Sequence, residues 1–284
     1  MEATNITATS DSKATTANEL VIDSIEDVDY ESDMEGSTQS ISSVDHEARQ
    51  VFQKYKDEWE ASEQRRALWS ALSNSTVEIG PVNKIVAFAC SSLSCQQKDD
   101  ERKDRDRTAA VQHALILTLH EFFQSRIPST GPAVQCFAQD PAYTNIDREI
   151  LGEVGITVLE DPHAFLELDE TSVVISISPD IPVREVTADL ARPAMMIWDQ
   201  VIWDQVEEEP DAAEVNAIDR QKTSREKDPD LPRLKKMTED HYVETSMPRY
   251  HDSFGSGRYH ASIYIRKTTT TPTRSETAEG GGIG

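Results

Sequence analysis

The sequence predicts an α/β protein: a three-layer, Rossmann-like, mostly parallel sheet of about five strands, between an acidic N-terminal tail and a polar C-terminal tail. Apolar segments of strand length alternate with amphipathic segments through short connections, which is the pattern of parallel βαβ units. Only 37% of the 284 residues are hydrophobic, and most of these lie between Val82 and Val206. That span has the usual size of one domain.

The first 45 residues form a Ser-, Thr- and acid-rich segment that is expected to be disordered. The stretch from Glu19 to Glu35 carries eight acids and no Lys or Arg, so it should stay solvated. Aliphatic residues among these acids leave a short docking strand for a partner as the alternative. Residues 46–75 are predicted as an N-terminal helix, because Phe52, Tyr55 and Trp59 form one apolar stripe at helical spacing. This stripe is expected to pack on the domain.

The α/β domain is expected at residues 80–206. Continuous apolar or β-branched runs predict strands buried on both faces, at residues 84–90, 133–138, 156–159, 172–178 and 194–199. Helical periodicity between them predicts helices at residues 108–126, 145–155, 162–168 and 183–191. Gly155 suits the position that follows a helix, where a left-handed conformation is common. We expect the strand order 3-2-1-4-5.

Residues 207–284 are predicted as a mostly disordered tail, because they are charged, contain prolines and show no hydrophobic period. Residues 258–267 are an exception. Ile263 and Ile265 alternate there with Tyr264 and Arg266. This alternation predicts a strand at the edge of the sheet or docked on it.

The formal net charge of −24 weighs against nucleic acid and anionic membrane as partners, because phosphates are bound by clustered Lys and Arg. No stretch approaches the ~20 apolar residues of a membrane span, and the first residues lack the pattern of a signal peptide. Three cysteines, an odd number, do not suggest a disulfide framework. We therefore expect a cytoplasmic or nuclear protein with no membrane attachment.

The loop after the first predicted strand, residues 89–107, contains no glycine. A dinucleotide-binding loop uses glycines so that the backbone can approach a pyrophosphate, so this mode of binding is disfavoured. Ser91 and Ser92 remain candidates to donate hydrogen bonds to a ligand. Residues 98–107 hold five acids and five bases, which indicates a solvated insertion.

The turn after the second predicted strand reads Asp140-Pro-Ala-Tyr143-Thr144. In Rossmann proteins an acid at this position accepts hydrogen bonds from ribose hydroxyls, which makes Asp140 the principal ligand-binding candidate. The alternative is structural: Thr144 fits a helix N-cap and Asp147 has capping-box spacing. Candidate ligand-binding residues are Asp140, Tyr143, Thr144, Ser91, Ser92 and Asp180.

Catalytic and metal-binding residues are not assigned. Asp161, His163 and Asp180 fall at strand ends, where a general base can lie, but their spacing matches no tight catalytic or metal motif. Zinc prefers four ligands at closer paired spacings than the three cysteines offer. The sequence names no cofactor.

Taken together, these pieces resemble the sensitivity-to-red-light-reduced (SRR-like) domain family, and its divergent fungal members most. The resemblance covers about residues 82–206. It is carried by "FACSSLS", "QHALILTLHEF", "CFAQDPAYTNIDREILGEVGITVLED", "SVVISISPDIPV" and "AMMIWDQV". Serines replace the glycines usual in the family's first loop, and the family's His-Cys near the end of the fourth strand is Ser178-Pro179-Asp180-Ile181-Pro182 here. These departures put any small-molecule site of the family in doubt.

The resemblance implies a regulatory role, because members are tied to light and circadian signalling in plants, haem-synthesis regulation in animals and microtubule stability in yeast. We therefore expect a non-enzymatic regulatory or interaction protein with an unidentified protein partner. The alternative is an enzyme or sensor that binds a nucleotide or S-adenosylmethionine at the carboxyl ends of the strands, with Asp140 on a ribose. A scaffold whose tails bind partners, with an inert domain, is a third reading.

Overall fold

The structure is a computed structural model that describes residues 32–95, 102–201, 228–229, 231–248 and 261–268, with side chains from residue 43 onward. One seven-stranded sheet has the order β3-β2-β1-β4-β5-β7-β6. Strands β1 to β5 are parallel, and β7 is antiparallel to both β5 and β6. The strands are β1 (Lys84–Phe88), β2 (Gln135–Gln139), β3 (Ile156–Val158), β4 (Ser172–Ser176), β5 (Met195–Asp199), β6 (Tyr242–Ser246) and β7 (Ala261–Arg266).

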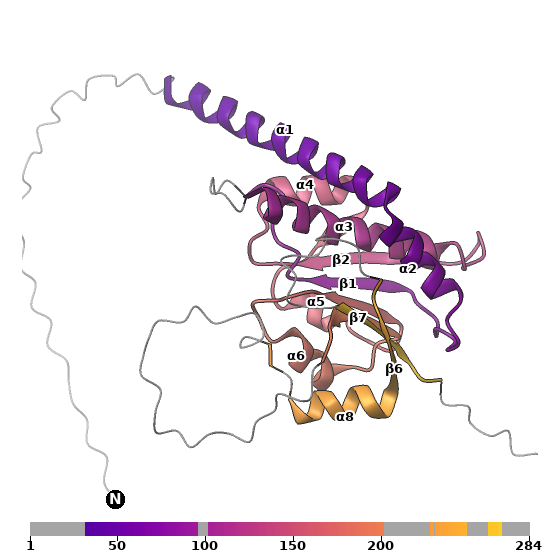
Figure 1. The fold of residues 1–284 in the computed structure, drawn as a ribbon. Helices are drawn as coiled ribbons and strands as arrows, with labels where there is room; N and C mark the ends of the chain where they lie inside the picture. The colour runs from indigo at the N-terminus through magenta and orange to yellow at the C-terminus, as the bar shows by residue number, and fades with distance from the viewer. Residues whose placement is uncertain (1–31, 96–101, 202–227, 230, 249–260, 269–284) are drawn as a thin grey trace, which may run out of the picture. The chain divides into compact units, whose positions relative to one another are not determined.

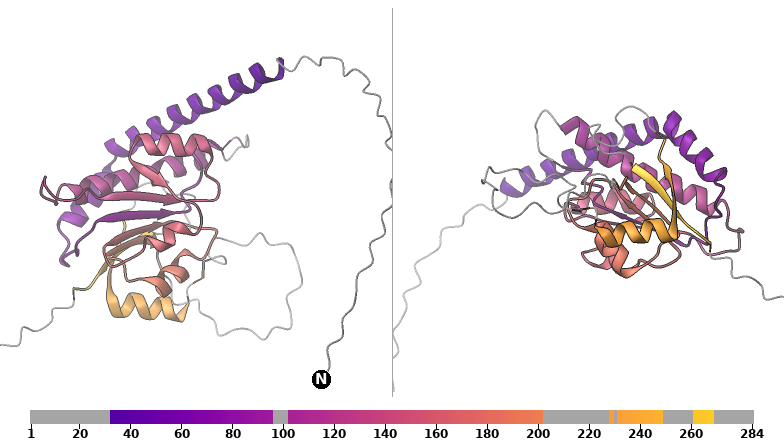
Figure 2. Two further views of the ribbon diagram at one scale, coloured as in Figure 1. Left: turned by 180° about the vertical axis from the view of Figure 1, so that it is seen from behind. Right: turned by 60° about the horizontal axis from the view of Figure 1, so that its bottom comes forward.

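Helices cover both faces of this sheet (Figures 1 and 2). The described helices are α1 (Ser32–Ala61), α2 (Glu63–Ser73), α3 (Arg102–Gln124), α4 (Asn145–Glu153), α5 (His163–Leu166), α6 (Val183–Leu190) and α8 (Pro232–His241). Apolar side chains of α1 to α4 pack on one face and those of α5, α6 and α8 on the other. Within the described ranges, none of these helices has the length and hydrophobicity to cross a membrane.

The α/β fold class and the order 3-2-1-4-5 are confirmed for the parallel strands. The sheet has seven strands, however, where about five were expected. Strand β7 lies inside the sheet between β5 and β6, although an edge or docked position was predicted for it. Both α8 and β6 lie in the region predicted as mostly disordered. Their sequences hid them because α8 is rich in charge, and three of the five residues of β6 are exposed.

Two helices begin earlier than the sequence indicated. Helix α1 begins at Ser32, inside the segment expected to be disordered, and Ser62 separates it from α2. Helix α3 begins at Arg102, so residues 102–107 belong to a helix and not to a solvated insertion. Helix formation is cooperative, so turns that are poorly apolar can extend a packed helix. Residues 1–31, the acidic core of the predicted tail, lie outside the described residues.

The stripe predicted in α1 lies in the core. Phe52 and Trp59 are buried, and the Trp59 indole Nε1 donates a hydrogen bond to Thr118 Oγ1 of α3 at 2.9 Å. Burying an aromatic side chain of this kind contributes about 2–3 kcal/mol. After α4, Gly155 has a φ of 84°, which confirms its role after the helix. The sheet and its helices thus form a fixed frame for the loops at each edge.

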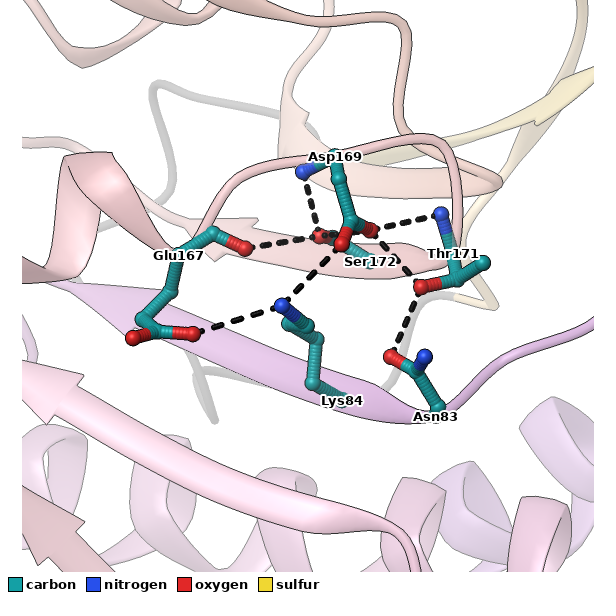
Figure 3. Close-up of polar contacts among 6 residues, drawn as sticks. All are labelled: Asn83, Lys84, Glu167, Asp169, Thr171 and Ser172. Atoms are coloured by element: carbon teal, nitrogen blue, oxygen red, sulfur yellow. Dashed lines mark hydrogen bonds and ion pairs between the residues drawn. The ribbon is translucent and has the colours of Figure 1, made fainter.

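The amino ends of β1 and β4 are joined by a polar cluster (Figure 3). The Lys84 ammonium contacts Asp169 at 3.0 Å and Glu167 at 3.3 Å. Partial burial acts to raise the pKa of Asp169. Hydrogen bonds from Thr171, Lys84 and Ser172 have the larger combined effect and lower this pKa to about 2. This cluster fixes the edge of the sheet opposite to the one where α/β proteins bind ligands.

Candidate functional site at the carboxyl edge of the sheet

The carboxyl ends of β1 and β4 mark the point where the strand order reverses. From β1 the chain proceeds to β2 and β3 on one side, whereas β4 and β5 lie on the other. Ligands of α/β proteins bind at such a switch point. The backbone is strained there: Ala89, Ser91 and Ser178 have positive φ angles of 56°, 64° and 53°. Glycine is the usual residue in this conformation, so alanine and serine adopt it at some energetic cost.

Asp147 organises the loop after β1. Its Oδ1 accepts hydrogen bonds from Leu93 N at 2.8 Å and Ser94 N at 3.1 Å. Its Oδ2 accepts from Ser92 Oγ at 2.8 Å, Ser94 Oγ at 3.1 Å and Thr144 N at 2.7 Å. The residue is fully buried, so protein donors take the place of its hydration shell. This carboxylate therefore acts as an internal anion that closes the β1–α3 loop onto α4.

The same carboxylate caps α4. Thr144 Oγ1 accepts a hydrogen bond from Asp147 N at 3.3 Å, and Asp147 returns one by accepting from Thr144 N. The capping box expected from the spacing is confirmed. What the spacing could not show is that the Asp147 carboxylate also reaches the loop after β1. An N3 acid close to a serine-rich loop was the only signal of this second role.

Asp140 joins the end of β2 to the same loop. Its Oδ2 accepts from Ser91 N at 2.8 Å, and its Oδ1 accepts from Ala142 N at 2.8 Å. The structure therefore brings together Asp140, Ser91, Ser92 and Thr144 from the predicted set. The carboxylate is half-buried, and two lone-pair positions remain available for a hydroxyl donor.

Tyr143 points away from the surface into the core. Its hydroxyl lies 2.7 Å from His113 Nε2, and His113 Nδ1 lies 2.7 Å from the Ala109 carbonyl oxygen. A carbonyl can only accept, so Nδ1–H donates to it and Tyr143 O–H donates to Nε2. Burial is the main influence on His113, and it lowers the pKa to about 4. Burial also raises the pKa of Tyr143. The Tyr143 side chain thus attaches the turn after β2 to the core.

The His113 pair gives a prediction for pH. The neutral imidazole is buried, so the folded chain binds its proton near pH 4, whereas the ordinary pKa is 6.5. The lower pKa in the folded state means that burying neutral His113 contributes to the free energy of unfolding. This contribution is complete above pH 6.5 and is lost as pH falls towards 4, a loss of about 3 kcal/mol. Urea unfolding between pH 4 and 7.5 should show a smaller loss for His113→Gln than for the wild type. His163→Gln, at an exposed histidine, should retain the wild-type profile, and parallel profiles for all three proteins would contradict the assignment.

The acid that contacts the loop after β4 is not the predicted Asp180 but Asp199. Asp180 is exposed, whereas the buried Asp199 at the end of β5 accepts from Ser178 N at 2.8 Å. Asp199 therefore does for Ser178 what Asp140 does for Ser91. Each of β1 and β4 is followed by a left-handed serine whose N–H donates to an aspartate at the carboxyl end of the adjacent strand. An acid as the last residue of a strand was the available signal for Asp199.

The remaining strand-end residues are Asp161, in the turn that follows β3, and His163, the first residue of α5. Asp161 accepts from Gln139 Nε2 at 2.8 Å, and the same Gln139 side chain accepts from Ala164 N at 2.8 Å. His163 is exposed. Among the described residues, no three His, Cys, Asp or Glu side chains are grouped closely enough to hold a metal ion. Cys90 and Cys136 are buried thiols, and burial raises the pKa of Cys90.

The comparisons with known families identify the domain. A family model described as "SRR1 domain" matches residues 49–264. The chain belongs to the SRR1 domain family. The match begins within α1 and ends in β7, so the SRR1 domain extends well beyond residues 82–206, over which the resemblance was read. It includes α8 and β6, which lie in the region predicted as a mostly disordered tail.

No curated protein matches the chain. Among solved structures, the bifunctional kinase-methyltransferase WbdD aligns with 11% identity and a TM-score of 0.31, over 72% of this chain and 37% of that one. The chain thus spans little more than a third of WbdD. Thermoplasma acidophilum 1320 aligns with 9% identity and a TM-score of 0.33, over 78% of this chain and 98% of that one. These alignments carry no functional argument here.

Proposed function

We propose that this chain is a non-enzymatic regulatory protein whose SRR1 domain acts by binding other proteins. The observation that carries the proposal is the buried Asp147 carboxylate on the amides of the β1–α3 loop. The roles implied by the family resemblance, in signalling, circadian or cytoskeletal regulation, are of this kind. A cytoplasmic or nuclear location is part of the same proposal.

The reasoning starts from what a phosphate-binding loop needs. Successive backbone N–H groups that converge on one point attract an anion, and in nucleotide-binding proteins that anion is the ligand's phosphate. Here Leu93 N and Ser94 N converge on Asp147 instead. A phosphate at this position would meet a fully buried negative charge. Binding through these amides would therefore require the loop and α4 to separate.

One observation favours a second candidate, a nucleotide- or S-adenosylmethionine-binding enzyme or sensor. The half-buried Asp140 directly follows β2, beside the point where the strand order reverses, and an acid there binds ribose hydroxyls in Rossmann proteins. Its interaction with Ser91 N uses one lone pair of one oxygen. A ribose could bind Asp140 without displacing Asp147.

A thermal-shift screen of the full chain separates the two candidates. The probes are ATP, GTP, NAD, S-adenosylmethionine and haem, each measured with the wild type and with Asp140→Ala. A ligand at 100 times its Kd would stabilise the protein by about 2.7 kcal/mol, a shift of roughly 5–10 °C for a domain of this size. We expect no shift with any probe. A shift that Asp140→Ala abolishes would overturn the proposed function in favour of the second candidate.

A further inference from the structure

Strand β6 is an edge of the sheet, and its pairing with β7 fixes which backbone groups face outward. Met247 N donates to Ala261 O and Lys267 N donates to His241 O. Hydrogen-bonded pairs alternate along an antiparallel ladder. In this register Val243, opposite Ile265, and Thr245, opposite Ile263, direct their backbone N–H and C=O groups towards β7.

The intervening residues consequently present their backbone to the free side. Glu244 and Ser246 each direct an N–H and a C=O outward, and both residues are exposed. Among the residues that the structure describes, no element pairs with β6 on this side. The Tyr242 N–H is used by the end of α8, where it donates to Thr238 O. The outward donors and acceptors of Glu244 and Ser246 are spaced to receive one more strand.

A groove runs beside this edge on the face of the sheet that α2 covers. Its volume is about 520 Å³. The floor is formed by Val243, Thr245, Ile263 and Ile265, and the wall by Ala67 and Ala71 of α2 with the residues that follow it. None of the lining side chains is charged. A strand added to β6 would place every second side chain in this neutral groove.

The opposite face of the same edge carries the Glu244 carboxylate among polar neighbours. Glu244 Oε1 accepts from Ser262 Oγ at 2.8 Å and from Gln200 Nε2 at 3.1 Å. Two copies of β6 paired about a two-fold axis centred on Glu244 would place their Glu244 carboxylates opposite each other, which is unfavourable. A partner residue opposite Glu244 is instead favoured if it is Lys or Arg.

We propose that β6 binds an extended segment of another protein by strand addition. The segment carries β-branched residues on the groove face and a Lys or Arg opposite Glu244. This proposal rests on the proposed interaction function and names its surface. The other edge strand, β3, fits less well, because it has only three residues and is followed, after Leu159, by Glu160 and Asp161.

The test is fluorescence anisotropy with the full chain and a labelled nine-residue peptide that alternates Thr and Val around a central Lys. A matched peptide has Glu at the centre, and a second has N-methylated backbone amides. We expect the Lys peptide to bind about fivefold or more tightly than the Glu peptide, and the N-methylated peptide to lose binding. Glu244→Lys should reverse the preference between the first two peptides.

Two proline variants locate the binding edge. Ser246→Pro removes an outward N–H and should weaken peptide binding about tenfold while leaving the melting temperature near that of the wild type. Thr245→Pro removes an inward N–H and should lower the melting temperature instead. If Ser246→Pro does not fold, the reversed peptide preference of Glu244→Lys still tests whether the peptide binds at β6. Failure of the peptide to bind would overturn this surface without changing the ligand screen that tests the proposed function.

Three further results would overturn the proposal in favour of another occupant or another surface. Binding that appears only after residues 269–284 are deleted would assign the edge to the chain's own C-terminal segment. Sedimentation that shows a dimer sensitive to Ser246→Pro would assign it to a second copy. Peptide binding unaffected by Ser246→Pro and Glu244→Lys would place the peptide elsewhere.

Discussion

Asp147→Ala is expected to lower the free energy of unfolding by about 4 kcal/mol, one of the two largest effects predicted for a single side chain of this domain. The substitution removes the acceptor for three backbone N–H groups and two hydroxyls. The hydroxyls can turn to other partners, and Ser94 N keeps a second acceptor in Ser92 Oγ at 3.0 Å. Leu93 N and Thr144 N, by contrast, lose the acceptor that they use here. Each buried donor left without a partner costs about 1–3 kcal/mol. Urea denaturation measures the loss.

Two controls separate this role from a general effect of the helix. Glu149→Ala, at an exposed position of the same helix, should change the free energy of unfolding by less than about 0.5 kcal/mol. Added formate should stabilise Asp147→Ala more than the wild type, because a small carboxylate can enter the space left between the loop and α4. A loss of under 1 kcal/mol, or equal response of both proteins to formate, would show that the amides find other partners.

The sequence predicted correctly those features that depend on residues close together in the chain. Continuous apolar strands such as β4, the Thr144 cap and the left-handed Gly155 depend on neighbours in the chain, and all three were predicted. The parallel sheet followed from the alternation of strands and helices, and the expected strand order was that of a Rossmann-like fold. Strand β6 could not be predicted in this way, because Glu244 to Ser246 are exposed, and the edge position that explains their polarity comes from pairing with β7.

The candidate site shows the same division. Asp140 was predicted from its place at the end of β2, and it does meet Ser91. Tyr143 was predicted as a ligand-binding candidate, and the fold turns it towards a buried histidine 30 residues earlier in the chain. Asp147 was visible as a cap, whereas its larger role depends on residues 53–55 positions away. Contacts of this range are set by the packing of α4 against the β1–α3 loop, which no local pattern encodes.

The second large effect is expected at the buried ion pair between Arg184 of α6 and Asp228. Both side chains are almost fully buried, at 2% and 1% exposure, and Arg184 Nε lies 2.8 Å from Asp228 Oδ2. Asp228 Oδ1 also accepts from Arg184 N at 3.2 Å. Asp228→Ala removes the carboxylate that contacts this buried guanidinium, so the free energy of unfolding should fall by about 3–5 kcal/mol.

The pair is expected to position α8 more than to stabilise the fold outright. Burial raises the pKa of Asp228 although Arg184 acts to lower it, and desolvation commonly offsets the attraction within a buried ion pair. Replacing both partners, as Arg184→Met with Asp228→Leu, should therefore recover most of the stability that Asp228→Ala loses. Asp228 lies just before α8, whose Arg233 also contacts Glu185 and Asp189 of α6. Hydrogen exchange should consequently quicken first in α8 and β6 in Asp228→Ala, and uniform quickening across β1 and β4 would argue against a local anchoring role.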